Sequence, residues 1–256
     1  MANITPIHKK GHKHKKENYC QISLTSVVCK VAENIVRFRV TAFWSDHLKP
    51  INQFRYLKGK SSLAELLSCY HHWCLTRNSS KAADVIFLDL SKAFDRVPHE
   101  RLLLKLNRHG IDGPLLLWLR NFLKNRQQRV TIRETYSSWS PVTSGVPQGT
   151  TLGPTLFLLN VNDISNVVTS FIKMFADDTK IYREINNAED TLALQSGLDF
   201  LENWTRSWKV KFNPQKCEVM RITHKQDKSK HPYHLSNAEL KSVNSCKDLG
   251  VDVSRD

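Results

Sequence analysis

The sequence lacks the features that mark secreted, zinc-finger and membrane proteins. Its six cysteines are scattered, with no CxxC pair and no histidine at zinc-finger spacing. Structural zinc and a disulfide framework are therefore disfavoured, and a reducing compartment is expected. The amino-terminal stretch MANITPIHKKGHKHKKEN has no apolar signal-peptide core, and no hydrophobic run approaches the length of a membrane span. We expect an intracellular protein that is not secreted and has no membrane partner.

Acidic residues are scarce relative to basic ones. The 256 residues include 38 Lys and Arg against 24 Asp and Glu, which gives a formal net charge of +14. Such an excess favours polyanionic partners through counterion release and electrostatic steering, although a solvated basic surface has the same balance. The tract HKKGHKHKK is compatible with a metal-binding run, a nuclear address, a phosphate-binding loop or a simple solvated charge run.

The chain has no internal repeat and no long Pro, Gly or Ser linker, and its length suits one large domain or two small ones. Its first 80 residues predict a basic loop and then helices near 24–40 and 63–76. Strands and helices mix after that point. Strands are expected at 84–89, 171–176, 179–185, 219–223 and 249–253, a hairpin over 128–142, and helices starting near 98, 114, 156 and 188. This order predicts an α+β fold.

Two adjacent acids interrupt the stretch KMFADDTKIY. Asp177 and Asp178 join two strand-like runs, and a turn alone explains Asp there because its side chain bonds the local backbone. Asp89, however, ends another predicted strand. Three carboxylates at one end of a sheet would raise one another's pKa, and a pair of Mg²⁺ ions would remove that conflict. Nucleotidyl transfer and nuclease hydrolysis fit such a site equally well.

Further residues bear on the choice between these two reactions. Phe94, five positions after Asp89, could return towards a nucleotide sugar or serve as an ordinary core side chain. The segment from Gly145 to Gly149 predicts a mobile backbone with one amide side chain, Gln148, suited to a nucleotide or template. GKS at 59–61 resembles the end of a P-loop, but Phe54 stands where the first glycine is required, which excludes that type of NTPase.

Four segments together resemble one enzyme family. IFLDLSKAFDRVPHERLLLKL, VTSGVPQGTTLGPTLFLLNVND, FADDTKIY and FNPQKCEVM occur in the order and approximate spacing of non-LTR (LINE-type, jockey-like) retrotransposon reverse transcriptases. The resemblance runs from about Ile4 to Val253. It implies right-hand polymerase fingers and palm, with an antiparallel palm sheet backed by helices and the thumb absent or truncated. Residues 1–80 would be mainly fingers, and 81–256 palm with an inserted fingers segment and a primer-grip-like hairpin.

The resemblance also implies roles for individual residues. Asp89, Asp177 and Asp178 would hold two Mg²⁺ ions, or Mn²⁺ instead, together with the main-chain carbonyl of Leu90. Lys216 would act as a general acid on departing pyrophosphate. The remaining matches are Phe94 as a steric gate against the ribose 2′-OH, Gln148 and Gly149 on the dNTP and template, Lys9 and Lys10 in the fingers loop, and Leu249 and Gly250 in the primer grip.

The implied activity is RNA-directed DNA polymerisation. Its partners would be an RNA template, a DNA primer, the RNA–DNA heteroduplex and a dNTP, in a nuclear or cytoplasmic ribonucleoprotein of unspecified oligomeric state. A nuclease would not explain Phe94 or Gln148, and a viral-type RNA polymerase usually has a smaller or polar side chain at the gate.

The match departs from the family in the fingers. Cys20 stands where the family has an Arg expected to clamp the triphosphate, and a thiol cannot make the bidentate contacts of a guanidinium. The segment from Gln53 to Ser61 lacks the family's middle Gly and Arg. Full elements of this type also encode a thumb and an endonuclease-like domain, which this sequence lacks, so we expect a fragment or a decayed copy. Together with the fingers departures, this gives the alternative function, a catalytically impaired nucleic-acid-binding remnant.

Overall fold

The computed structural model describes residues 1–9, 11–47, 51–224 and 231–255. The chain forms two compact units: residues 1–49 with 92–161, and residues 50–91 with 162–256. None of the described helices is long and apolar enough to cross a membrane. The assignment of residues 1–80 to fingers and 81–256 to palm stays a prediction, as does its boundary.

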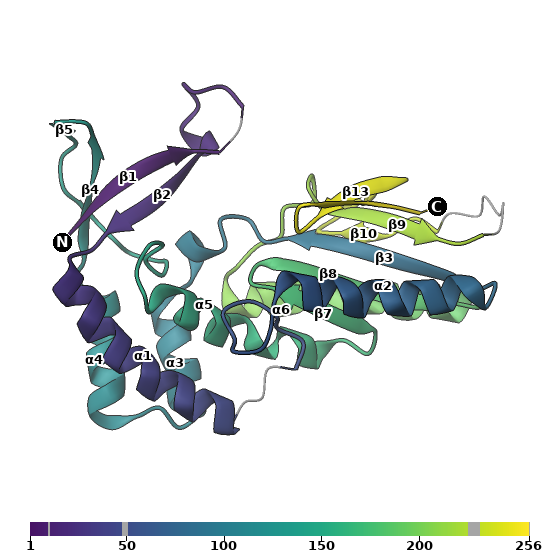
Figure 1. The fold of residues 1–256 in the computed structure, drawn as a ribbon, viewed down its shortest axis with the longest axis horizontal. Helices are drawn as coiled ribbons and strands as arrows, with labels where there is room; N and C mark the ends of the chain where they lie inside the picture. Colours follow the sequence, from purple (N-terminus) through teal and green to yellow (C-terminus); the bar gives the residue numbers. More distant parts are fainter. Residues whose placement is uncertain (10, 48–50, 225–230, 256) are drawn as a thin grey trace. The chain divides into compact units, whose positions relative to one another are not determined.

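The first unit combines a small sheet with helices (Figure 1). Its sheet has the order β2-β1-β4-β5, with β6 also paired to β4; β1 and β4 run parallel and the other pairs are antiparallel. Its strands are β1 (Ala2–His8), β2 (Tyr19–Leu24), β4 (Gln127–Ile132), β5 (Thr135–Tyr136) and β6 (Ser140–Pro141). Its helices are α1 (Val27–His47), α3 (His99–Arg108), α4 (Gly113–Leu123), α5 (Gly153–Val161), and the short 3₁₀ turns η1 (Lys16–Asn18) and η2 (Phe94–Arg96).

The prediction of a basic loop before the first helix was wrong. β1 and β2 form an antiparallel hairpin, in which Ile7 lies opposite Cys20, and only the connection between them carries the basic run. Ala2 and Ile4 are buried, at the positions where β1 also pairs with β4. The burial of these two alternate side chains favours a strand, and so does pairing with residues 126 positions further along the chain. Neither feature can be detected from the local sequence.

A buried acid links two helices of this unit. Glu33 on α1 accepts hydrogen bonds from the backbone N–H groups of Thr151 (2.8 Å) and Leu152 (3.0 Å), immediately before α5. A carboxylate is favourable there because the first N–H groups of a helix have no partner within the helix. Several apolar side chains of α1 are exposed, namely Val27, Val28, Val31, Ile35 and Phe38.

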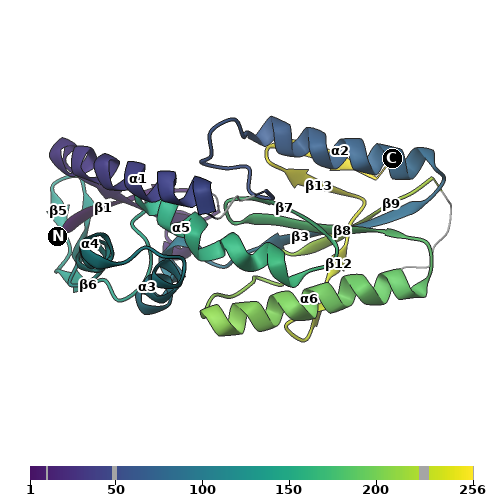
Figure 2. The ribbon, with the colours of Figure 1, turned by 90° about the horizontal axis from the view of Figure 1, so that it is seen from below.

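The second unit is a sheet between two long helices (Figures 1 and 2). The sheet order is β12-β9-β3-β8-β7, with antiparallel pairs except β12 with β9. Its strands are β3 (Ala82–Asp89), β7 (Phe171–Phe175), β8 (Asp178–Ile185), β9 (Glu218–Ile222) and β12 (Lys241–Ser242). Two hairpins accompany it, β10 (His234–Leu235) with β11 (Ala238–Glu239), and β13 (Ser245–Asp248) with β14 (Val251–Ser254).

Figure 2 shows α2 (Ser62–Asn78) over one face of this sheet and α6 (Ala188–Trp208) over the other. The 3₁₀ segment η3 (Asn162–Val167) packs on α6, where Trp204 Nε1 donates to Asp163 Oδ1 at 3.0 Å. Leu194, Leu198 and Leu201 on α6 are buried and belong to the core. The cluster beneath α2 contains Cys69, Trp73, Val85, Tyr182, Met220, Ile222 and Val253. The α+β prediction, with an antiparallel sheet backed by helices, is confirmed.

Candidate active site and nucleotide-binding loop

The predicted acids meet at one end of the sheet in the second unit. β3 and β8 pair antiparallel with Asp89 directly opposite Asp178, so the two Cα atoms are neighbours across the ladder. Phe175 pairs with Asp178 on the other side, which leaves Ala176 and Asp177 as a two-residue turn. Ala176 has a φ of +60°, in the left-handed region that a non-glycine residue seldom adopts. The juxtaposition of acids expected from the sequence is therefore present.

Gln53 holds this turn from an adjoining segment. Its Oε1 accepts hydrogen bonds from the backbone N–H groups of Ala176 (2.9 Å), Phe54 (3.1 Å) and Arg55 (3.0 Å). Gln53 is buried and forms an isolated parallel bridge with Met174 on β7. One amide oxygen therefore connects the strained turn to a second stretch of backbone.

The acidic edge has an unfavourable charge balance. Asp178 has an exposed face, but the protein packed around it desolvates its carboxyl. This desolvation, followed by the negative charges of Asp177 and Asp89, raises the pKa of Asp178 to about 6, although Arg55 acts in the opposite direction. The neighbouring carboxylates therefore add to the effect of burial at Asp178. A positive charge placed here would relieve the repulsion.

Lys216 lies beside the first acid. Its Nζ is 3.3 Å from Oδ2 of Asp89, and its backbone N–H closes a turn by donating to the carbonyl of Asn213 at 2.9 Å. The Asn213 N–H in turn donates to the Asp89 carbonyl at 2.8 Å, so backbone hydrogen bonds connect both residues. Leu90, the next residue after Asp89, is buried and bridges to Phe212.

The donor chemistry of this edge fits a divalent cation. Carboxylate and carbonyl oxygens are the ligands that Mg²⁺ prefers, and the charges of Asp177 and Asp89 add to burial in raising the pKa of Asp178. Within the described residues, no three His, Cys, Asp or Glu side chains already form a cluster that could hold a metal ion. The backbone therefore brings the three acids to one edge of the sheet, but their side chains do not form a complete metal-binding cluster.

The second part of the predicted site is the loop between β6 and α5 in the first unit. Its backbone is held at both ends: Gly145 N–H donates to the Val97 carbonyl, Val146 N–H to the Phe94 carbonyl, and the Gln148 carbonyl accepts from Ser23 N–H, all at 2.7–2.8 Å. The expectation of a mobile backbone was wrong. The loop is fixed between the start of α3 and the edge strand β2.

Two glycines make this fixation sterically feasible. A Cβ on Gly149, whose φ is +97°, would lie 2.6 Å from the Ser23 carbonyl oxygen. A Cβ on Gly145, whose φ is +91°, would lie 2.8 Å from the backbone oxygen of Asp95. Both positions require glycine for its conformational freedom and for its lack of a side chain. The loop can therefore present Gln148 from a defined backbone.

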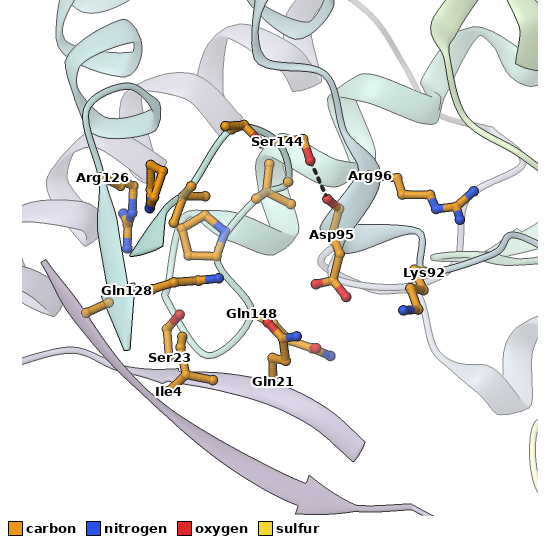
Figure 3. A pocket seen from close by; sticks show the side chains of 17 residues that line it. Ile4, Gln21, Ser23, Lys92, Asp95, Arg96, Arg126, Gln128, Ser144 and Gln148 are labelled. Atoms are coloured by element: carbon orange, nitrogen blue, oxygen red, sulfur yellow. Dashed lines mark hydrogen bonds between the residues drawn. The ribbon is translucent and has the colours of Figure 1, made fainter. Parts of the chain in front are cut away.

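A polar pocket of about 360 Å³ lies beside the loop (Figure 3). Its labelled side chains come from β1, β2, β4, the residues around η2 and the loop: Ile4, Gln21, Ser23, Lys92, Asp95, Arg96, Arg126, Gln128, Ser144 and Gln148. Desolvation raises the pKa of Asp95, while Lys92 and Lys9 lower it. Carboxamides and cations suit a polar or anionic ligand, and apart from Gln148 none of these pocket residues was singled out from the sequence.

The remaining predicted residues have definite surroundings. Phe94 is half-buried, with its ring stacked on Phe157 at a centroid distance of 4.4 Å. Lys9 is exposed, and its backbone N–H donates to the Asn18 carbonyl at 2.8 Å, whereas Lys10 lies outside the described residues. Leu249 and Gly250 form the turn of the β13–β14 hairpin, not the start of a strand.

The structure thus groups Asp89, Asp177, Asp178 and Lys216 at one edge of the second unit, whereas Phe94, Gln148 and Gly149 belong to the first unit. The sequence reading missed Gln53 and Lys180 as supporting residues. The only sequence signal for Gln53 was that it matches the Gln at the start of the family's fingers motif. Lys180 forms buried ion pairs with Glu65 and Asp248, and no local sequence pattern indicates such pairs.

Comparisons with known proteins identify the family. Residues 7–253 match the model of the family described as Reverse transcriptase (RNA-dependent DNA polymerase). The chain is 32% identical, over 99% of its length, to the RNA-directed DNA polymerase from mobile element jockey of Drosophila melanogaster. It is 27% identical, over 100% of its length, to the probable RNA-directed DNA polymerase from transposon BS of the same organism. It spans 29% of the length of each of these relatives.

A solved structure has a similar fold. Apo telomerase from Candida tropicalis, truncated from its C-terminal domain, superposes with a TM-score of 0.64 at 11% identity, covering 99% of this chain and 53% of the telomerase chain. This likeness supports the predicted fingers and palm fold. The chain belongs to the reverse transcriptase (RNA-dependent DNA polymerase) family.

Proposed function

We propose that this chain is the polymerase core of a mobile-element reverse transcriptase, which extends a DNA primer with dNTPs on an RNA template. The observation that carries the proposal is the register that sets Asp89 opposite Asp178, with Asp177 in the adjoining turn and Lys216 3.3 Å from Asp89. Membership of the reverse transcriptase family supports the same reaction. The RNA–DNA heteroduplex is the expected product, and the net charge of +14 suits its binding.

Asp89, Asp177 and Asp178, with the Leu90 carbonyl, would hold two Mg²⁺ ions or Mn²⁺ in their place. Bound there, the ions would supply Lewis-acid stabilisation of the charge that develops on the reacting oxygens. The carboxylates contribute the negative charge that holds them. Asp178 has to be deprotonated for this role, and its pKa of about 6 leaves it ionised at neutral pH and above.

In the reaction, the primer 3′-hydroxyl gives up its proton to solvent and its oxygen forms a bond to the α-phosphorus of the dNTP. The bond from that phosphorus to the oxygen bridging the α- and β-phosphates breaks, and pyrophosphate leaves. The Lys216 ammonium can give a proton to the departing pyrophosphate, since its flexible side chain lies at the acidic edge. Asp89 holds that ammonium until a triphosphate competes for it. Phe94 would exclude a ribose 2′-OH, while Gln148, Gly149, Lys9 and Lys10 would contact the dNTP and template.

Primer extension on poly(rA)/oligo(dT) with Mg²⁺ tests the proposal. The wild-type chain should incorporate dTTP, and Asp177→Ala should lose that incorporation. Asp199→Ala is a matched control, because it removes the charge of an exposed acid on α6. No incorporation by a well-folded wild-type chain, or equal incorporation by Asp177→Ala, would count against the assignment.

A second candidate function rests on Cys20. In β2 this thiol lies opposite Ile7 in β1, at the position where the family has a phosphate-binding Arg. The alternative is a catalytically impaired chain that binds RNA–DNA duplex in a salt-sensitive way, independently of the acids. Its test is duplex binding by the Asp177→Ala variant together with extension by Cys20→Arg. Restored extension would identify lost triphosphate binding as the defect.

A further inference from the structure

A lysine is buried between two acids in the second unit. Nζ of Lys180 on β8 lies 2.6 Å from Oδ2 of Asp248 on β13 and 3.0 Å from Oε1 of Glu65 on α2. The side chains of these three residues, which we call the Lys180 triad, are 2%, 5% and 0% exposed, respectively. A charged group at that depth requires partners, and here the three residues of the triad come from three different elements.

Overall stability is a poor explanation for such a triad. All three groups have lost their hydration, and burial raises the pKa of Glu65 although the neighbouring Lys180 lowers it. Well-packed apolar side chains of similar size often stabilise a fold as well as a buried ionic triad does. Ionic groups differ from apolar ones in being directional, because they fix which groups lie opposite one another.

The triad connects the acidic edge to another hairpin. Lys180 follows Asp178 by two residues on β8, so their side chains share a face of the sheet. Asp248 is the last residue of β13, directly before the turn formed by Leu249 and Gly250. One buried lysine therefore joins the strand that carries Asp178 to the base of that turn.

The turn itself needs support. Leu249 has a φ of +48° and Gly250 one of +92°, which is the pattern of a two-residue hairpin turn with both central residues in the left-handed region. Glycine adopts this conformation readily, but leucine is strained in it because its Cβ approaches the following carbonyl oxygen. Such strain persists only where the surrounding structure determines it, and Asp248 supplies an anchor at the adjacent residue.

We propose that Lys180 is a positioning residue, which fixes the Leu249–Gly250 turn relative to the strand of Asp178 and thereby sets where a primer end lies. The functional half of this inference rests on the proposed polymerase function. Attack by the 3′-oxygen needs an approach of about 3–3.5 Å, and a displacement of about 1 Å can lower the rate by roughly 100-fold. A loosened turn would therefore reduce turnover more than it reduces dNTP affinity.

The single variant Lys180→Met would leave two carboxylates facing each other and could fail to fold. The informative variant replaces the whole triad with apolar groups, Glu65→Met, Lys180→Met and Asp248→Leu together. The matched control is a second buried ionic group in the same sheet, where Arg221 Nε and the Tyr233 hydroxyl bond Asp84 at 2.8 and 2.7 Å. That control carries Asp84→Leu, Arg221→Met and Tyr233→Phe.

Hydrogen exchange measured by mass spectrometry tests the anchor without any need for activity. In the folded triad variant, residues 245–254 should exchange at least 10-fold faster than in the control, whereas β7 should be unchanged. In primer extension, kcat should fall about 10- to 100-fold with the KM for dNTP within about 3-fold. Unchanged exchange in the hairpin, or faster exchange with unchanged kcat, would overturn the inference.

If the wild-type chain does not extend primers, the proposed function fails and the positioning role is tested by duplex binding instead. Fluorescence anisotropy with an RNA–DNA duplex that has a recessed 3′ end should then show at least 10-fold weaker binding by the triad variant than by the control. Equal affinity of the two variants would overturn the role of Lys180 as well.

Discussion

Replacing Gln53 with methionine should loosen the turn that carries Asp177. Methionine keeps the approximate length and volume of glutamine but removes the acceptor Oε1. Phe54 N–H keeps a partner, since it also donates to the Met174 carbonyl at 2.9 Å. The hydrogen bonds at risk are those donated by Arg55 N–H and Ala176 N–H, at 3.0 and 2.9 Å.

The expected loss of stability follows from these two donors. A buried donor left without an acceptor costs about 1–3 kcal/mol, and the Arg55 group is partly exposed and can be rehydrated. Within the described residues Gln53 Nε2 has no hydrogen-bond partner, so removing it returns part of that energy. The free energy of unfolding should therefore fall by about 2 kcal/mol, which is equivalent to roughly 1 M in the urea midpoint.

Urea unfolding and residue-resolved hydrogen exchange measure the two consequences. Exchange of the Ala176 N–H should quicken by roughly 30-fold if its local opening becomes about 2 kcal/mol easier. Gln53→Glu is the control, because a carboxylate keeps the acceptor and should preserve the protection of Ala176. A Gln53→Met protein with wild-type stability and unchanged exchange at Ala176 would refute the reasoning.

Three further outcomes are expected. Gly149→Ala should destabilise the protein by at least 1–2 kcal/mol more than Gly113→Ala in equilibrium unfolding, because both have positive φ but only Gly149 has backbone within 3 Å of the added Cβ; equal losses would contradict this. Burial lowers the pKa of His99, so unfolding takes up a proton and stability falls as pH drops through about 6.5; His99→Gln should reduce the stability difference between pH 7.5 and 5.5, and an unchanged difference would argue against it. Because the folded-state pKa of Asp178 is raised to about 6, its contribution to stability is lost as pH rises from about 4 through 6. At pH 8 Asp178→Asn should raise Tm without divalent cations and shrink the Tm increase caused by Mg²⁺, and the opposite change in either measurement would refute the repulsion argument.

Local patterns predicted the acidic edge well. The apolar run ending in Asp89 forms β3, and the two runs around Asp177 and Asp178 form β7 and β8, within one or two residues of the expected bounds. Short runs of strand-forming residues, and the preference of Asp for turns, indicate these elements in the sequence. The pairing of β3 with β8 joins residues about 90 positions apart, and it was inferred from the chemistry that three acids could perform.

The supporting contacts could not be predicted in this way. Gln53 bonds Ala176 across 123 residues, and Lys180 meets Asp248 across 68. In the sequence, Lys180 looks like an ordinary polar residue in a strand, because period-two alternation does not distinguish a solvated lysine from one beneath a helix. The hairpin of β1 and β2 was missed for a related reason, since its stabilising partner β4 lies more than 100 residues away.

The charges around the acidic edge argue for a divalent cation more strongly than the three acids alone. Glu65 and Asp248 are two further acids close enough to Asp178 for their charges to interact with its carboxyl group. Three cations interact with these acids: Arg55 with Asp178, Lys180 with Glu65, and Lys216 with Asp89. Burial is the largest cause of the raised pKa of Asp178, and the negative charges of Asp177, Asp89 and Asp248 raise it further against the opposing effect of Arg55. Although the chain has a net charge of +14, its fold places Asp89 opposite Asp178 at this edge. Because a dication would offset the repulsion among these carboxylates, Mg²⁺ binding should stabilise the folded chain even without a nucleotide or primer.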